Sequence, residues 1–210
     1  MLIRQTTLAA IALSTTALLC SCSKNDASAT PKADKPETVP AARIQPAPPS
    51  GQTQAPAAVT LHAGDAAPAL SVEQWLKGSP VSCFQTGTVY VVEFWATWCP
   101  PCVANIPHLT KLQAEHPEVV IIGVAASERK PTDGKPDTRV EKLNTFIAQR
   151  GDAIGYRMAY DEDRSMSRAW MAPAGRNTIP TAFIVGKDGK LAWIGHPGEM
   201  DAQLASALAK

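Results

Sequence analysis

Several features that mark other classes of protein are scarce in this chain. Its 20 basic and 19 acidic residues give a formal net charge of +1, and no basic patch or basic stripe interleaved with aromatics is visible. Nucleic acid is therefore not expected as a partner. His108, His116 and His196 are widely scattered, and no second Cys or His pair stands at the spacing of a four-ligand zinc site. We expect no bound metal and no separate cofactor.

A long hydrophobic run is also missing. The apolar stretch from Leu8 to Leu19 is too short to span a bilayer as a helix, and it follows a single charge, Arg4, as in a signal peptide. It ends in Leu19-Cys20-Ser21-Cys22, which resembles a lipoprotein signal. The resemblance implies that residues 1–21 are a lipoprotein signal peptide and that Cys22 becomes the lipidated first residue of the mature protein.

Two alternatives to this signal stay open. Lipidation could fall on Cys20, although the bulky Leu19 would then occupy the cleavage position. The segment could also be an ordinary cleaved secretory signal. A lipid anchor would place the protein in the envelope of a Gram-negative bacterium, facing the periplasm. Ser23 after Cys22 favours the outer membrane over the inner one.

Large apolar residues are scarce between the signal and the rest of the chain. Residues 22–60 are rich in alanine and contain seven prolines, but their only larger aliphatic residues are Val39, Ile44 and Val59. Such a segment buries too little surface to offset its chain entropy, so we expect a disordered tether. In polyproline-like form it could reach on the order of 100 Å from a membrane. A spacer without any particular reach fits the same composition.

The remaining residues, 61–210, are enough for one domain with a sizeable hydrophobic core, and one motif stands out in them. The stretch Val91 to Cys102 reads V-V-E-F-W-A-T-W-C-P-P-C. β-Branched and aromatic residues from Thr88 to Phe94 predict a buried strand. Pro100 and Pro101 suit the first turn of a helix, where missing N–H groups are tolerated. Cys99 should therefore lie at a helix N-terminus, with Cys102 one turn further in.

This placement favours redox chemistry. A helix N-terminus lowers the pKa of a thiol, and a second thiol three residues on lies on the same helix face and can close a disulfide. Half a zinc site and a structural disulfide are the alternatives. The zinc site lacks its second ligand pair, and a disulfide that closes a single turn stabilises little. A C-x-x-C pair between strand and helix is typical of a redox centre.

The motif F-W-A-T-W-C-P-P-C, with Pro107 and the later Thr178-Ile179-Pro180-Thr181, resembles the thioredoxin superfamily. Within it, residues 62–210 are most similar to the TlpA/ResA-like thiol–disulfide oxidoreductases of bacterial envelopes. The resemblance implies a thioredoxin fold, with Cys99 as the attacking thiolate and Cys102 as the resolving thiol. It also implies that Pro180 is a cis-proline facing the disulfide, beside which a client polypeptide can pair. An ordinary turn proline is the alternative.

The rest of the domain alternates between strands and helices before it ends in a hairpin. This order predicts an α/β fold, a three-layer α/β/α sandwich with a mixed central sheet. A polar loop is expected at 127–138, and Pro107 should bend the helix that contains it. Strands are predicted up to Leu76 and at 118–125, 156–160, 181–185 and 191–194, and helices after Thr138, around Trp170 and from about Glu199.

Glu93 is a carboxylate within an otherwise apolar strand. By strand periodicity it points to the opposite face from Val92 and Phe94. Thioredoxins hold a buried Asp at the matching position, and the resemblance implies that Glu93 moves a proton to or from Cys102, with its pKa raised by burial. Many TlpA-like proteins have Asn there. The alternative is a strand Glu that faces solvent.

Three further residues carry expectations about the site. We expect Trp98 to shield the disulfide and, with Ile179 and Pro180, to contact substrate. Cys83 is an odd cysteine, expected to be a buried inert thiol, with a redox or partner-linked role as the alternative. Pro100 and Pro101 have no N–H group to donate to the Cys99 thiolate. The reduced form is therefore less stabilised, which favours a reducing pair.

The sequence therefore predicts an enzyme that reduces protein disulfides through Cys99 and Cys102. Expected partners are disulfide-bearing client proteins and, by family resemblance, a membrane electron donor of the DsbD/CcdA type. We expect a monomer. Two alternatives remain: a disulfide oxidant or isomerase, and a non-catalytic thioredoxin-like module that handles copper through the same cysteines. The client, the donor and the membrane are not specified by the sequence.

Overall fold

The computed structural model describes residues 60–72 and 74–210. The predicted signal peptide, the lipidation site Cys22 and the predicted tether up to residue 59 lie outside the described residues. Among the described residues, no helix has both the length and the hydrophobicity that crossing a membrane requires.

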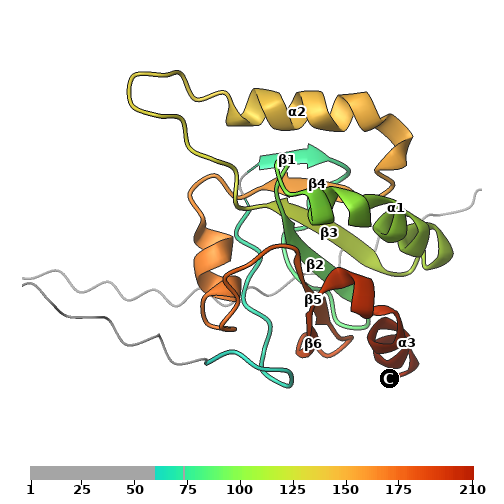
Figure 1. The fold of residues 1–210 in the computed structure, drawn as a ribbon. Coiled ribbons are helices and arrows are strands. Elements are labelled where there is room, and N and C mark those ends of the chain that lie inside the picture. The colour runs from blue at the N-terminus through green and yellow to red at the C-terminus, as the bar shows by residue number, and fades with distance from the viewer. Residues whose placement is uncertain (1–59, 73) are drawn as a thin grey trace, which may run out of the picture. The chain divides into compact units, whose positions relative to one another are not determined.

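A six-stranded mixed sheet forms the centre of the domain (Figure 1). β2, β3 and β4 run parallel to one another, and β1, β5 and β6 pair antiparallel to their neighbours. The strand order is β1-β4-β3-β2-β5-β6, with bounds β1 Gln74–Lys77, β2 Tyr90–Trp95, β3 Val120–Ala125, β4 Arg157–Tyr160, β5 Thr181–Val185 and β6 Leu191–Gly195. All six predicted strands are present, with ends shifted by a few residues.

The described residues contain three α-helices and three short helical segments, of which η3 and α3 follow the last strand. The bounds are α1 Pro100–Glu115, α2 Arg139–Arg150, η1 Gly151–Ala153, η2 Ser167–Met171, η3 Pro197–Glu199 and α3 Asp201–Ala209. α2 ends at Arg150, and Gly151 is its C-cap. The helix predicted around Trp170 is a π-helix, η2, rather than an α-helix. Pro107 lies inside α1, which continues through it to Glu115.

The alternation of side chains along β2 builds two hydrophobic cores. Val91 and Trp95 point to one face of the sheet, where they pack with buried residues of α1, α2 and α3. Val92 and Phe94 point to the other face. Because all six residues of β2 are buried, both faces must be covered, as in a strand inside a parallel sheet.

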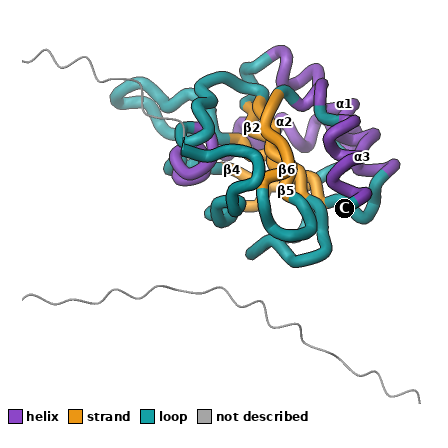
Figure 2. The backbone as a smooth tube through the Cα atoms, turned by 90° about the horizontal axis from the view of Figure 1, so that it is seen from below, coloured by secondary structure: helices purple, strands orange, loops and turns teal. Residues whose placement is uncertain are grey.

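The second face has a thinner cover. Trp170 and Met171 of η2 pack there with Leu61 and half-buried residues of the loops before β2. Figure 2 shows α1 and α3 on one side of the sheet and the η2 region on the other. The three-layer α/β/α sandwich is thus confirmed, and its second helical layer consists of η2 and irregular chain.

One edge of the sheet is partly covered by an earlier part of the chain. Residues 64–67 run along β6 and the turn before it. The Gly64 N–H donates to the Leu191 carbonyl at 2.7 Å, and the Leu191 N–H donates to the Asp65 carbonyl at 2.8 Å. Ala66 forms a β-bridge with Lys190. The other edge is β1, a strand of four residues.

Candidate redox site

Cys99 and Cys102 lie at the junction between β2 and α1, as the motif predicted. Cys99 is the N-cap of α1, and Pro100 and Pro101 occupy the first two helical positions. The two cysteines form a disulfide, and the Cys102 N–H donates to the Cys99 Sγ at 3.3 Å. Since proline has no N–H, this amide is the first helix donor that can reach the sulfur.

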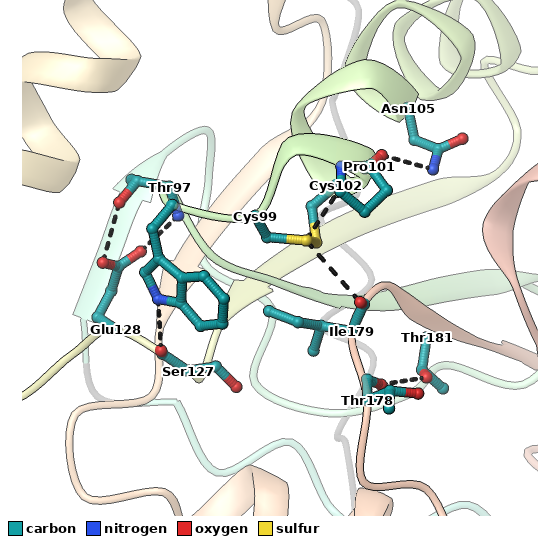
Figure 3. Close-up of a disulfide and its surroundings, with 11 residues drawn as sticks. Thr97, Cys99, Pro101, Cys102, Asn105, Ser127, Glu128, Thr178, Ile179 and Thr181 are labelled. Atoms are coloured by element: carbon teal, nitrogen blue, oxygen red, sulfur yellow. Dashed lines mark hydrogen bonds between the residues drawn. A yellow bond between two sulfur atoms is a disulfide. The ribbon is translucent and has the colours of Figure 1, made fainter.

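The loop before β5 lies against this disulfide (Figure 3). The peptide bond between Ile179 and Pro180 is cis, as the resemblance implied. The Ile179 carbonyl oxygen is 3.8 Å from the Cys99 Sγ. The hydroxyl of Thr181 donates to the Thr178 carbonyl at 2.8 Å and closes the turn around the proline. The structure therefore brings together Cys99, Ile179 and Pro180, which are far apart in the sequence.

The two sulfurs are unequally accessible. Cys99 is 3% exposed and Cys102 is 1% exposed, but Cys99 alone lines the open cleft of about 940 Å³ beside the disulfide. An incoming group therefore reaches Cys99 first, and Cys102 is covered by α1 and the core.

Glu93 is buried at the centre of the sheet, with 1% of its surface exposed. The interpretation as a solvent-facing strand residue is therefore wrong. Glu93 has the same strand parity as Val91 and Trp95, which pack in the core that contains Cys102. Its Oε1 has no hydrogen-bond partner among the described residues. Burial alone raises the pKa of this carboxyl from its ordinary 4.5 to about 8, so it keeps its proton at neutral pH.

Trp98 stands at the rim of the cleft rather than as a closed cover over the disulfide. Its side chain is 43% exposed. The indole N–H donates to the Ser127 carbonyl at 2.9 Å, and the guanidinium of Arg129 lies 4.7 Å from the ring centre. The indole is thus held by a hydrogen bond at its N–H and by a cation over its ring.

A carboxylate that the sequence analysis did not single out fixes the turn before Cys99. Glu128 is buried although it lies in the predicted surface loop. Its Oε1 accepts from the Thr97 N–H at 2.6 Å and its Oε2 accepts from the Thr97 hydroxyl at 2.9 Å (Figure 3). This pair of bonds connects the loop after β3 to the turn that presents the disulfide. The sequence signal would have been an acidic residue three positions after the buried strand ends.

A second buried carboxylate, Asp161, holds the start of η2. Its Oδ1 accepts from the Met166 N–H at 3.1 Å, and its Oδ2 accepts from the Ser167 N–H at 3.0 Å. η2 forms one wall of the cleft, so Asp161 positions that wall. Arg164, just before η2, has a φ of 63°, in the left-handed region that non-glycine residues rarely adopt.

Four arginines line the cleft, and none of them was predicted from the sequence. They are Arg129, Arg164, Arg168 and Arg176, and none of the described residues that line the cleft is acidic. Each comes from a loop or from η2, so no periodic pattern in the sequence marks them.

Other candidates lie away from the disulfide or are engaged elsewhere. His108 bonds Asp201 at 2.8 Å, and His196 Nδ1 accepts from the Gly198 N–H. Cys83 is half-buried in the loop before β2 and has a bonding partner, so the expectation of a buried inert thiol is wrong. Within the described ranges, no group of three or more His, Cys, Asp or Glu side chains could hold a metal ion.

Comparison with known proteins gives a consistent family. The Redoxin family model matches residues 62–208. The protein FixW of Rhizobium leguminosarum is 34% identical over 140 residues, which cover 66% of this chain and 62% of FixW. The thiol–disulfide oxidoreductase ResA of Halalkalibacterium halodurans is 29% identical over 115 residues, which cover 54% of this chain and 56% of ResA. The chain thus spans about three fifths of the length of these relatives.

The fold has solved counterparts. A crystal structure of a thioredoxin-family thiol:disulfide interchange protein from Chlorobium tepidum matches 69% of this chain and 96% of that chain, with a TM-score of 0.53 and 23% identity. This likeness supports the thioredoxin-like arrangement of the sheet and its helices. With the family model matched over most of the chain and the disulfide at the start of α1, the chain belongs to the Redoxin family, as a TlpA/ResA-like member of the thioredoxin superfamily.

Proposed function

We propose that this protein is a thiol–disulfide oxidoreductase that reduces disulfides in client proteins through Cys99 and Cys102. The observation that carries the proposal is the disulfide at the start of α1, whose Cys99 lines an open cleft while Cys102 is covered. A nucleophile at the surface and a resolving thiol behind it are what two successive exchanges require.

The proposed reaction starts from the dithiol form. The Cys99 thiolate attacks one sulfur of the client disulfide; that S–S bond breaks, a mixed disulfide forms and one client thiolate leaves. The Cys102 thiolate then attacks the Cys99 sulfur and releases the second client thiolate. The client gains two electrons and two protons, and the enzyme ends with the Cys99–Cys102 disulfide. Ile179, Pro180 and Trp98 are proposed to hold the client backbone beside Cys99.

Glu93 is proposed to take the proton of Cys102 in the second exchange. A carboxyl with a pKa of about 8 is matched to a thiol that must ionise near neutral pH. Its place on the same face of the sheet as the core around Cys102 supports this role. The carboxyl takes the proton in its ionised form, which is the minority below about pH 8, and its Oε1 has no hydrogen-bond partner among the described residues.

The direction of electron flow is inferred from the start of α1. Pro100 and Pro101 leave the Cys102 N–H as the helix amide that bonds the Cys99 sulfur. Each missing hydrogen bond to a thiolate withholds roughly 1.5–3 kcal/mol from the reduced form. About 1.4 kcal/mol corresponds to 30 mV for a two-electron couple, so we expect a reducing pair.

The setting of the reaction is proposed from the sequence. Residues 1–21 would direct export, Cys22 would carry the lipid, and residues 22–60 would tether residues 61–210 on the periplasmic side of a membrane. A membrane donor of the DsbD/CcdA type would reduce the disulfide again. We propose that the domain works as a monomer.

Insulin reduction and a redox titration test the proposal. The protein should accelerate insulin precipitation by dithiothreitol, Cys99→Ser should not, and the reduction potential should lie below about −150 mV. A potential above that value, near the roughly −120 mV of the oxidant DsbA, would favour an oxidant. Stoichiometric copper binding by the reduced form without insulin reduction would favour the metal-handling alternative.

A further inference from the structure

The cleft beside the disulfide carries positive charge that the protein itself does not neutralise. Arg129, Arg164 and Arg176 form no ion pair with any of the described carboxylates, and Arg168 has only the exposed Asp163, at 3.6 Å. The whole chain has a formal net charge of only +1. Four cations around one cleft are therefore a local concentration and not the result of a basic composition.

Asp163, next to Arg164 in sequence, pairs with Arg168, and three other nearby carboxylates are committed to different partners. Both oxygens of Glu128 accept from Thr97. Both oxygens of Asp161 accept from backbone amides at the start of η2. Glu162 accepts from Gln74 and faces Arg139. None of them lines the cleft, so the arginines are left to face the solvent or a bound group.

The four arginines reach the cleft from separate segments of the chain. Arg129 stacks on Trp98, next to Cys99 in sequence, and Arg176 is anchored by a hydrogen bond to the Ile194 carbonyl. Arg164 lies just before η2 and Arg168 lies within it. A π-helix and a left-handed Arg are both conformations that concentrate at functional sites. Cys99 and all four arginines therefore line the same cleft.

Part of the lining of the cleft is apolar: Met171, Ala172, Ile179 and the two prolines contribute to it. A group that fits should therefore combine carboxylates with apolar surface. At about 940 Å³ the cleft is at the upper end of the volumes that hold small ligands, and it has room for several residues of a peptide.

We infer that the clients of this protein carry acidic residues beside the cysteines that it reduces. The inference rests on the proposed function and names its substrate class: a disulfide in a polypeptide segment with Asp or Glu near one cysteine. Guanidinium groups bind carboxylates through paired hydrogen bonds, and a cationic cleft raises the rate of encounter with an anionic partner. The chemistry at sulfur is the two-step exchange described above.

Two disulfide-linked peptides that differ only in charge test the inference. One carries Glu on both sides of each cysteine, and the other carries Gln at the same places. The second-order rate constant with the reduced full-length protein should be about tenfold higher for the Glu peptide at low salt. The ratio should approach one as salt shortens the Debye length.

The variant Arg164→Gln with Arg176→Gln should bring the Glu-to-Gln rate ratio to within about twofold of one. The ratio is used because removing cations also changes the reactivity of the Cys99 thiolate. This change affects the rates with both peptides equally. Arg164→Lys with Arg176→Lys should keep the preference. Lys111→Gln with Lys142→Gln, which removes the same charge from exposed positions of α1 and α2, should leave the ratio as in the parent protein.

The outcomes separate the two proposals. Equal rates for both peptides, or a preference that survives Arg164→Gln with Arg176→Gln, would overturn the acidic-client inference and leave the proposed function intact. A rate for oxidised glutathione that exceeds that of the Glu peptide would also overturn it, in favour of a small anionic disulfide. Failure of both peptides and of the neutral bis(2-hydroxyethyl) disulfide would contradict the proposed function itself.

Discussion

The Sγ atom of Cys99 lies 3.8 Å from the carbonyl oxygen of Ile179, a residue 80 positions further along the chain. In the disulfide this sulfur carries no hydrogen, so the contact is one of proximity (Figure 3). It places a polar backbone group from the loop before β5 next to the more accessible sulfur, where an extended client can meet both at once.

This arrangement predicts which sulfur captures a client. Cys102→Ser should accumulate mixed disulfides through Cys99, because the attack can occur but the resolving thiol is gone. Non-reducing electrophoresis of cells that express the full chain would reveal them as bands that disappear with dithiothreitol. Cys99→Ser is the matched control and should trap far less, since Cys102 is covered. Equal trapping by the two variants would contradict the assigned order.

The burial of Glu93 predicts a stability that depends on pH. Below pH 4.5 the carboxyl is protonated in both the folded and the unfolded protein, and its burial imposes no ionisation penalty. As pH rises from 4.5 towards 8, the unfolded chain loses this proton and the folded protein keeps it, so the free energy of unfolding falls.

Glu93→Gln removes this pH-dependent loss in the free energy of unfolding. The variant should be more stable than the parent by about 3 kcal/mol at pH 7, with a gain that shrinks towards pH 5. Urea unfolding of the oxidised proteins across this pH range measures it. A difference that stays constant with pH would show that the carboxyl does not titrate as described.

The same variant should slow the release of the client. With Glu93 as the base, the breakdown rate of a preformed mixed disulfide at Cys99 should rise with pH through about 8. Glu93→Gln should lower this rate roughly 100-fold and abolish the inflection. Release of a chromogenic thiol from Cys99 in a single turnover reports it. Glu93→Asp should restore part of the rate, and unchanged kinetics in Glu93→Gln would remove Glu93 from the proton path.

Glu128 should stabilise the turn that presents the disulfide. Glu128→Ala leaves the Thr97 N–H without its acceptor, and we expect a loss of about 1–3 kcal/mol in the free energy of unfolding. Hydrogen exchange should speed up at residues 96–99. The control is Glu118→Ala, which removes an exposed pair with His116 and should change stability by less than about 0.5 kcal/mol. Equal effects of the two substitutions would argue against a special role for Glu128.

The parts of the fold that depend on neighbours in sequence were predictable. β2, the turn and α1 follow from a run of β-branched and aromatic residues, two cysteines and two prolines within a dozen positions. The loop around Pro180 was predicted only through family resemblance, because nothing local in Thr178 to Thr181 says that it meets Cys99.

Contacts between distant segments explain what was missed. Glu128 lies in a stretch whose prolines and glycine indicate a surface loop, and only its bonds to Thr97 reveal why it is buried. Arg164 and Arg176 look like ordinary solvent-facing cations, because their grouping is created by the path of the chain around η2. The π-helix itself has no distinct sequence pattern, so the sequence predicted a helix around Trp170 without its type.

The strip of chain at residues 64–67 has a consequence for how the protein behaves in a crowded compartment. The unpaired N–H and C=O groups of an edge strand can form hydrogen bonds with another extended chain, such as a segment of an unfolded protein. Here the early chain already occupies hydrogen-bonding positions at the start of β6, and the opposite border is a strand of only four residues. Neither edge of the sheet therefore offers a long row of free hydrogen-bonding groups. We expect unfolded polypeptide to bind at the disulfide cleft, and not to add to the sheet and start aggregation.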